Sequence, residues 1–409
     1  GNLLQVGQLL AGTGNVTASA GGDLTTLALT GALYAGNVNL SAGGNVSLQQ
    51  VGTTSGNIDL KAGGNLTQHQ NVVTGEGNLT AHADGDLTTL ADTTVTGTGN
   101  IDYSAGGNAS LQYVTTGTGN IDLKAGGNLT QNALVQTGAG NLTAHADGDL
   151  TTLADTTVTG TGNIDYSAGG NASLQNVTTG NGNIDLATLV GDLTQNALVQ
   201  TANGNVTAVA GRDLLMAVGA RTEVSGNGDV AYTAGNELLV DEISAVNGNV
   251  ALTASNGSIQ VHGTAAHNVS AKQLTANAAS DIGTNDALRT NIDTLVANAT
   301  NGSIVVSEAD DVTLDNVAAA NGSVSVDAGN IAINQLQGDS IDLYSTGKVE
   351  TLAGGLVKGG SLNIGAETGV NLHTAVDRAT VSVNGTGDIV LAEDDGITLT
   401  RLNLSLIHL

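Results

Sequence analysis

The residues of this chain best suited to chemistry form short clusters of histidine and carboxylate side chains. His82, Asp84 and Asp86 stand at alternate positions, a spacing that would suit proton transfer or metal binding. The same triplet recurs 63 positions later, as His145, Asp147 and Asp149. An active site needs particular residues in one place, so a tandem copy argues against catalysis. We therefore interpret Asp84 and Asp86 as corner residues that cap backbone amides.

Two acidic runs are the candidates for a metal site. The candidate ligands are Glu308, Asp310 and Asp311 in one run and Glu393, Asp394 and Asp395 in the other. Oxygen-rich loops of this kind are what Ca²⁺ prefers, and the runs fall on equivalent parts of their repeats. We expect no cofactor, with calcium at these residues as the open alternative.

Other polar residues give weaker signals. Two pairs of carboxylates fall in register between neighbouring repeats, Asp102 with Asp122 and Asp165 with Asp185. Such pairs would share a calcium ion or simply be solvated, with Lys124 nearby. His262 and His267 are possible ligands in a stretch of irregular period. No serine, histidine and acid arrangement emerges, and no phosphate-binding Gly-Lys-Ser or Gly-Lys-Thr occurs, so we expect no enzyme.

The chain that positions these clusters repeats itself. Residues 77–112 recur unchanged as residues 140–175. Within the 63-residue offset, a shorter motif of Gly-Asn followed by alternating apolar and polar residues appears three times. A constant period near twenty residues, carried by short strands between glycines, indicates a solenoid with one coil per period.

One coil illustrates the prediction. After Asn120, the residues Ile121, Leu123 and Ala125 alternate with polar residues, which is typical of a strand with one buried face. A glycine pair follows, then a second strand at Leu129 and a third near 134–137. The predicted fold is all-β, a right-handed parallel β-helix with three short strands per coil of about 20 residues. Corner asparagines are expected because they tolerate a left-handed backbone and bond to neighbouring coils.

The repeats divide the chain into three segments. Residues 1–258 are expected to form regular coils that include the three-coil duplication. Residues 259–300 lose the period and are expected to form an irregular coil or a loop, and residues 301–409 further coils. About 18 coils at the strand spacing predict one rod of roughly 90 Å.

Composition supports a narrow coil and limits the partners. The 409 residues include 59 glycines but no proline, cysteine, tryptophan or phenylalanine, so Val, Leu, Ile and Ala must fill the interior. The formal net charge of -27 makes nucleic acid a poor partner, and no apolar run is long enough to span a membrane. Because residue 1 is Gly, we expect a processed form or a piece of a longer chain.

The sequence motifs of the coils resemble those of a known family. The strings AGGNLT, GNIDLKAGGNLT and GNVTA, with later NGSI and NGSV corners, resemble the haemagglutinin-type repeats of filamentous haemagglutinin and related two-partner secretion exoproteins of Gram-negative bacteria. The resemblance implies a secreted protein at the bacterial cell surface, whose β-helical shaft serves adhesion, aggregation or biofilm formation. The implied partners are host-cell or neighbouring-cell surfaces, glycans or matrix.

Four functions remain to be weighed. A structural adhesin shaft explains the duplication, and a self-assembling extracellular fibre, joined end to end, is the main alternative. A polysaccharide-degrading β-helix enzyme is less favoured, because six tyrosines and no tryptophan offer little for sugar stacking. Ice binding would need Thr-X-Thr on most coils, and Thr94 to Thr96 and Thr157 to Thr159 provide it on only two.

Overall fold

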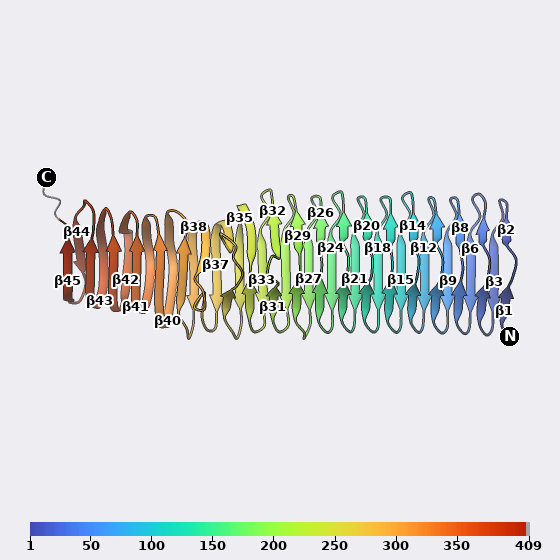
Figure 1. Ribbon diagram of the computed structural model, residues 1–409, viewed down its shortest axis with the longest axis horizontal. Helices are drawn as coiled ribbons and strands as arrows, with labels where there is room; N and C mark the ends of the chain where they lie inside the picture. Colours follow the sequence, from blue (N-terminus) through green and yellow to red (C-terminus); the bar gives the residue numbers. More distant parts are fainter. Residues whose placement is uncertain (406–409) are drawn as a thin grey trace. The chain divides into compact units, whose positions relative to one another are not determined.

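The structure, a computed structural model, describes residues 1–405 of the chain. Its regular elements within that range are β-strands alone, β1 to β45, and the pairings between them are parallel. The chain divides into two compact units, Gly1–Gly211 and Arg212–Leu409, and each is a stack of coils with strands side by side (Figure 1). The prediction of an all-β parallel β-helix with short strands in each coil is confirmed.

Unit 1, Gly1–Gly211, contains three parallel ladders of strands. The first ladder, with mostly five-residue strands, comprises β3 (Val16–Ala20), β6 (Val38–Ala42), β9 (Ile58–Ala62), β12 (Leu79–Ala83), β15 (Ile101–Ala105), β18 (Ile121–Ala125), β21 (Leu142–Ala146), β24 (Ile164–Ala168), β27 (Ile184–Thr188) and β30 (Val206–Ala210). The second comprises β1 (Leu3–Gln5), β4 (Leu24–Thr26), β7 (Val46–Leu48), β10 (Leu66–Gln68), β13 (Leu87–Thr89), β16 (Ala109–Leu111), β19 (Leu129–Gln131), β22 (Leu150–Thr152), β25 (Ala172–Leu174) and β28 (Leu193–Gln195). The third comprises β2 (Leu9–Ala11), β5 (Thr30–Ala32), β8 (Val51–Thr53), β11 (Val72–Thr74), β14 (Thr93–Val95), β17 (Val114–Thr116), β20 (Val135–Thr137), β23 (Thr156–Val158), β26 (Val177–Thr179) and β29 (Leu198–Thr201).

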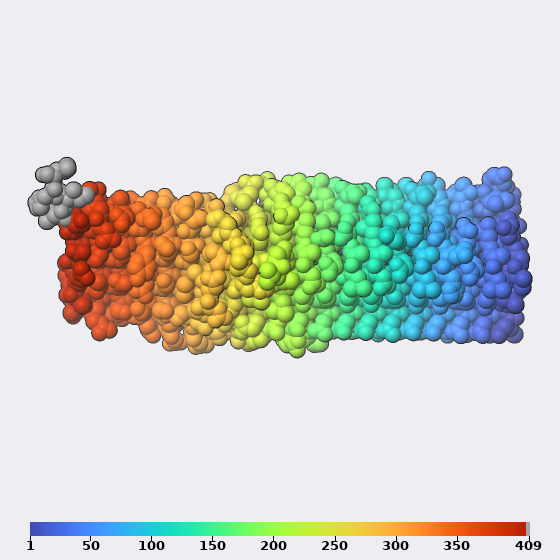
Figure 2. All heavy atoms as spheres, in the orientation of Figure 1, coloured from blue at the N-terminus to red at the C-terminus, as the bar shows by residue number. Residues whose placement is uncertain are grey.

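The interior of unit 1 is built from alternate positions of these strands. In β18, Ile121, Leu123 and Ala125 are buried while the residues between them face outward. Register is kept between coils, so that Ile121 pairs with Ile101 on one side and with Leu142 on the other. Aliphatic residues therefore stack on aliphatic residues along the unit, and the coils form a closely packed surface (Figure 2).

The glycines of unit 1 allow coils to approach one another closely, and are not needed for the backbone conformation of their turns. No glycine of residues 1–211 has a positive φ, so the corners do not need a left-handed backbone. A Cβ on Gly77 would instead lie 2.0 Å from the carbonyl oxygen of Gly56, and one on Gly140 would lie 2.0 Å from that of Gly119. The Gly-Asn motif thus exists because successive coils approach too closely at this corner for any side chain.

The corner asparagines correct one expectation and confirm another. Non-glycine residues with positive φ are absent from the described chain, so left-handed conformation does not explain these asparagines. Their side-chain oxygens instead accept a hydrogen bond from the next coil. The backbone N–H of Asn78 donates to Oδ1 of Asn57 at 2.9 Å, and that of Asn100 donates to Oδ1 of Asn78 at 2.8 Å. Each asparagine thereby ties its coil to its neighbour.

Unit 2, Arg212–Leu409, has the same parallel stacking with longer strands. It contains β31 (Leu214–Met216), β32 (Arg221–Val224), β33 (Val230–Ala234), β34 (Leu238–Val240), β35 (Glu242–Ala254), β36 (Ile259–Val261), β37 (Val269–Ala278), β38 (Leu288–Ala299), β39 (Ile304–Glu308), β40 (Val312–Ala328), β41 (Ile331–Ser345), β42 (Lys348–Ala366), β43 (Gly369–Val383), β44 (Ile389–Glu393) and β45 (Thr398–Leu404). Strands such as β40 and β41 continue through a corner, where their pairing shifts register. Fewer glycine corners therefore give fewer but longer strands.

Residues 259–300, where the sequence gives no clear period, contain strands β36, β37 and β38. Between them run two stretches without strand, 262–268 and 279–287, apart from a single bridging residue, Ile282. Ile282 bridges to Ile259 and to Ile304, so its layer continues the stack. These two stretches add residues outside the ladder, which is why the period is hard to follow in the sequence.

Candidate functional site

The two acidic runs of unit 2 occupy equivalent positions, as their first residues show. Glu308 is buried and its carboxylate accepts hydrogen bonds from the Thr290 hydroxyl at 2.6 Å and from the backbone N–H of Ala309 at 2.9 Å. Glu393 accepts one from the Thr374 hydroxyl at 2.6 Å. Burial raises the pKa of Glu308, against the effect of these hydrogen bonds. The first carboxylate of each run therefore ties its coil to the preceding one, where its threonine partner lies.

The remaining acids of these runs face other partners. Asp310 is an exposed corner residue, while Asp311 accepts from the backbone N–H of Asn330 at 2.7 Å. Asp394 lies 2.7 Å from Nε2 of His373, a hydrogen bond that raises the pKa of His373. Its neighbour Asp395 has its own pKa raised by hydrogen bonding to Glu393. Within residues 1–405 no group of three or more His, Cys, Asp or Glu side chains is arranged to hold a metal ion, and calcium at these runs stays a prediction.

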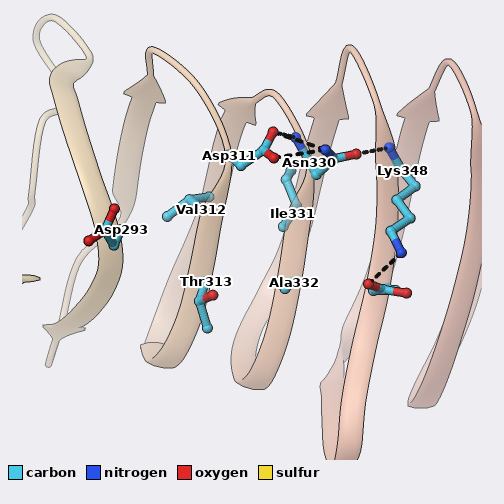
Figure 3. Close-up of a pocket in the computed structure, with 9 residues that line it drawn as sticks. Asp293, Asp311, Val312, Thr313, Asn330, Ile331, Ala332 and Lys348 are labelled. Atoms are coloured by element: carbon cyan, nitrogen blue, oxygen red, sulfur yellow. Dashed lines mark hydrogen bonds and ion pairs between the residues drawn. The ribbon is translucent and has the colours of Figure 1, made fainter. Parts of the chain in front are cut away.

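Asp311 borders a shallow hollow of about 340 Å³ on the face of unit 2, which polar and apolar residues line together (Figure 3). Both oxygens of Asp311 accept from the side-chain amide of Asn330, at 3.0 and 2.9 Å, and these hydrogen bonds lower the pKa of Asp311. Asn330 in turn accepts from the backbone N–H of Lys348 at 2.9 Å, and Lys348 Nζ lies 2.7 Å from a Glu350 oxygen. These polar groups are satisfied by one another, which is the pattern of a corner ladder rather than of a prepared ligand site.

The duplicated histidine cluster of unit 1 has an arrangement that the sequence did not reveal. His82 lies on β12, with its Nδ1 at 2.8 Å from the hydroxyl of Ser104 on β15 and its Nε2 at 2.9 Å from Oδ1 of Asp84. The second copy repeats the contacts, with His145 at 2.8 Å from Ser167 and 3.0 Å from Asp147. The serine escaped notice because it stands one whole coil away and meets the histidine only through the register of the stack.

The corner interpretation of the acids in this cluster holds for one of the two. The backbone N–H of Asn108 donates to Oδ1 of Asp86 at 2.7 Å, so Asp86 does cap the next coil. Asp84 instead orients the imidazole of His82. A serine, a histidine and a carboxylate in hydrogen-bonding sequence form the arrangement that activates nucleophiles in hydrolases.

The stacked aspartates behave as a partly solvated column. Asp102 and Asp122 are register partners, and Lys124 Nζ lies 2.5 Å from Oδ2 of Asp122. In the other pair, burial and the charge of Asp185 raise the pKa of Asp165. Like charges in register repel one another, and the lysine offsets this in the first pair only.

The other sequence candidates are dispersed. In unit 2, Nε2 of His262 lies 2.6 Å from the carbonyl oxygen of Met216, whereas His267 lines a separate small hollow. The hydroxyls of Thr94 and Thr115 lie 3.4 Å apart, but Gln136 interrupts their column in the next coil. The threonine column is therefore short.

Sequence reasoning missed a buried polar cluster in unit 1. The Tyr103 hydroxyl lies 2.6 Å from Thr93 Oγ1 and 3.3 Å from Oε1 of Gln68, and all three residues are buried. Gln131, Thr156 and Tyr166 repeat the cluster. Burial raises the pKa of Tyr103. The sequence did contain a sign of this cluster. Tyr103 stands in the same inward column as the small Ala81 of the preceding coil, and polar residues occupy two inward positions nearby.

No protein-family model, curated protein or solved structure matches the chain. No helix long and apolar enough to cross a membrane occurs in residues 1–405. The resemblance to haemagglutinin-type repeats and the absence of enzymatic activity both stay predictions.

Proposed function

We propose that this chain is the structural shaft of a secreted bacterial surface adhesin, which holds binding surfaces away from the cell in adhesion, aggregation or biofilm formation. The observation that supports this most strongly is the duplication at atomic detail. Gln68 and Tyr103 in one copy, and Gln131 and Tyr166 in the next, make the same buried contact at 3.3 and 3.2 Å. Because each repeat unit makes the same contacts with the next copy, further units can be added to the stack without new kinds of contact.

Length is the property that such growth supplies. Each coil contacts the coils before and after it, and each adds about 4.8 Å along the ladder. The corner asparagines, such as Asn57 and Asn78, form hydrogen bonds between neighbouring coils. Each added coil therefore also adds the hydrogen bond that holds it to its neighbour. The outward positions stay free to differ, and the net charge of -27 keeps such a surface hydrated.

The partners of the proposed shaft are host or neighbouring cell surfaces, glycans or matrix, reached by regions that the shaft carries. A secreted location fits a chain without cysteine, because its coils fold without disulfide bonds after export. This part of the proposal rests on the sequence resemblance to haemagglutinin-type repeats.

Deletion of one repeat unit tests the shaft proposal. Removing residues 77–139 joins Glu76 to Gly140 and preserves the corner motif. We expect a folded protein about 14 Å shorter, with unchanged β-type circular dichroism, because three whole coils are lost. Small-angle scattering measures the length, and bacteria displaying both forms report adhesion.

The matched control is a deletion that does not remove a whole number of coils. Removing residues 77–129 joins Glu76 to Thr130 and leaves a partial coil, so the strands at the junction lose their register and their partners. If both deletions unfold the protein, the coils are not modular and the shaft proposal fails. If the shorter folded form adheres as well as the full form at every cell spacing, length is not the selected property.

A fibre that assembles end to end is the second candidate, and the exposed strand β45 favours it. Leu399, Leu402 and Leu404 on this strand are 45%, 51% and 43% exposed. Within the described residues β45 pairs with β43, and a strand of this kind is able to pair along its other edge with a strand of another copy. Sedimentation equilibrium distinguishes the candidates: concentration-dependent polymers that Leu402→Lys abolishes would favour the fibre, whereas a monomer at all concentrations would exclude it.

A further inference from the structure

One outward column of unit 1 contains four serines, and three of them, Ser41, Ser104 and Ser167, have different pairs of neighbours. The column runs through the first ladder in register, as Ser19, Ser41, Lys61, His82, Ser104, Lys124, His145, Ser167 and Ala187. Ser104 has a histidine on one side and a lysine on the other. Ser167 has a histidine and an alanine, and Ser41 a serine and a lysine.

The contacts of His82 fix its tautomer. A carboxylate only accepts hydrogen bonds, so in the neutral imidazole Nε2 carries the proton that is donated to Asp84 at 2.9 Å. Nδ1 is then the free base, and the Ser104 hydroxyl donates to it at 2.8 Å. Asp84 thereby holds the ring with its basic nitrogen turned towards the serine.

We propose that Ser104 is a nucleophile that accepts an acyl group from a small carboxylic ester, with His82 as general base. In this step the Ser104 Oγ–acyl carbon bond forms and the bond from that carbon to the leaving oxygen breaks. The hydroxyl proton passes to Nδ1 of His82 and from there to the leaving alcohol or to water, so no oxidant or other reactant is needed. This activity is separate from the shaft role and does not depend on it.

The site is open to a substrate and selects by charge. The His82 side chain is 41% exposed, so an ester can reach the imidazole and its serine from solvent. The neighbouring outward column carries Asp59, Asp102 and Asp122, which repel anionic esters. A neutral or cationic ester is therefore the expected class of substrate.

Lys124 stands next to the reacting serine in the column, with its ammonium group paired to Asp122 at 2.5 Å. It is the register partner of Ser104 on β18, and its hydrogen bond to Asp122 raises the pKa of its ammonium group. A cation next to the attacked carbonyl stabilises the negative oxygen of the tetrahedral intermediate. Ser167 has Ala187 in this position, so the second copy retains the base but lacks the cation.

The chain contains its own controls for an experiment. Trypsin cleaves after Lys61, Lys124 and Arg212, which places Ser41, Ser104 and Ser167 in three different peptides. The full-length protein is treated with p-nitrophenyl acetate, and mass spectrometry follows acetylation of each serine with time. Neutral hydroxylamine removes a serine ester but leaves a lysine amide, which separates the two reactions.

The expected order of acetylation is Ser104 first, Ser167 second and Ser41 last. Ser104 should react about tenfold or more faster than Ser41, as a positioned general base requires. His82→Gln keeps a polar side chain but removes the base, and should lower Ser104 acetylation to the rate of Ser41. Lys124→Gln should lower it to the rate of Ser167; because this substitution removes the tryptic site between the two serines, that variant is digested with a protease that cleaves at aspartate. His145→Gln, the matched control, should leave Ser104 unchanged.

Circular dichroism of each variant shows that the coils remain folded, since these side chains all lie on the surface. Equal rates at Ser104 and Ser41 in the unmodified protein would overturn the proposal. A Ser104 rate that His82→Gln leaves unchanged would also overturn it. Equal rates at Ser104 and Ser167 would overturn the role of Lys124.

Discussion

Substituting Gly140 by alanine separates two explanations of the Gly-Asn corner. If glycine served only to allow chain flexibility, alanine would be neutral or would stabilise the fold by roughly 0.4–1 kcal/mol, because it lowers the entropy of the unfolded chain. The structure predicts the opposite sign. A Cβ at Gly140 would lie 2.0 Å from the carbonyl oxygen and 2.4 Å from the carbonyl carbon of Gly119.

The size of the effect follows from what must move. Both contacts are with backbone, so the two coils have to separate locally by more than an ångström. Overpacking of this kind costs roughly 1–3 kcal/mol. The same movement weakens the hydrogen bond from Asn141 N–H to Oδ1 of Asn120, now 2.8 Å, which adds about 1 kcal/mol. We expect Gly140→Ala to lower the free energy of unfolding by about 2–4 kcal/mol.

Thermal unfolding followed by circular dichroism measures the effect. At about 2–4 °C per kcal/mol for a unit of this size, the melting temperature should fall by roughly 5–15 °C. Gly52→Ala is the matched control, because the nearest atom to its added Cβ is the Val73 carbonyl oxygen at 3.5 Å, an ordinary contact. If Gly140→Ala melts at or above the unmodified protein, steric stacking does not explain the glycine column.

Two further predictions concern buried polar groups. Tyr103→Phe removes the hydroxyl that bonds to Thr93 and should cost about 1–3 kcal/mol in urea unfolding, whereas Tyr113→Phe, at a residue 48% exposed, should cost nothing measurable. A smaller loss in Tyr103→Phe/Thr93→Val than in the two single variants combined would confirm their coupling, and strict additivity would refute it. Glu308 has a raised pKa, so its contribution to stability is full below 4.5 and is lost as pH rises through the higher folded value. The stability of the unmodified protein relative to Glu308→Gln should therefore fall as the pH rises above 4.5, and a difference independent of pH would contradict the assignment.

The architecture was readable from the sequence because one pattern repeats in every coil. Alternation at Ile121, Leu123 and Ala125 is a local signal that fixes which face is buried, and repetition fixes the direction of stacking. The third strand, β20 (Val135–Thr137), falls within the stretch expected for it. In unit 2 the strands run through their corners, and the spacing alone does not show that β40 is one element.

What the sequence concealed depends on contacts between coils. The Gly-Asn motif has the same sequence whether its glycine serves a turn or a close approach between coils. Only the distance from a Cβ added at Gly140 to the backbone of Gly119 distinguishes the two roles. His82 and Ser104 stand 22 positions apart, and they meet because the register of β12 and β15 puts them side by side. A period that varies between 20 and 22 residues makes such partners ambiguous until the register is known.

The same construction explains how chemistry can arise on a repeated scaffold. Gly and Asn at the corner and the aliphatic positions inside are constrained in each coil, whereas the outward positions carry little of the stability. Duplication copied His82 and Ser104 as His145 and Ser167, but the next coil differs, with Lys124 beside the first serine and Ala187 beside the second. An outward residue therefore acquires its neighbours from whichever coil follows it. Two identical strings of sequence can in this way become two unequal sites without any change in the fold.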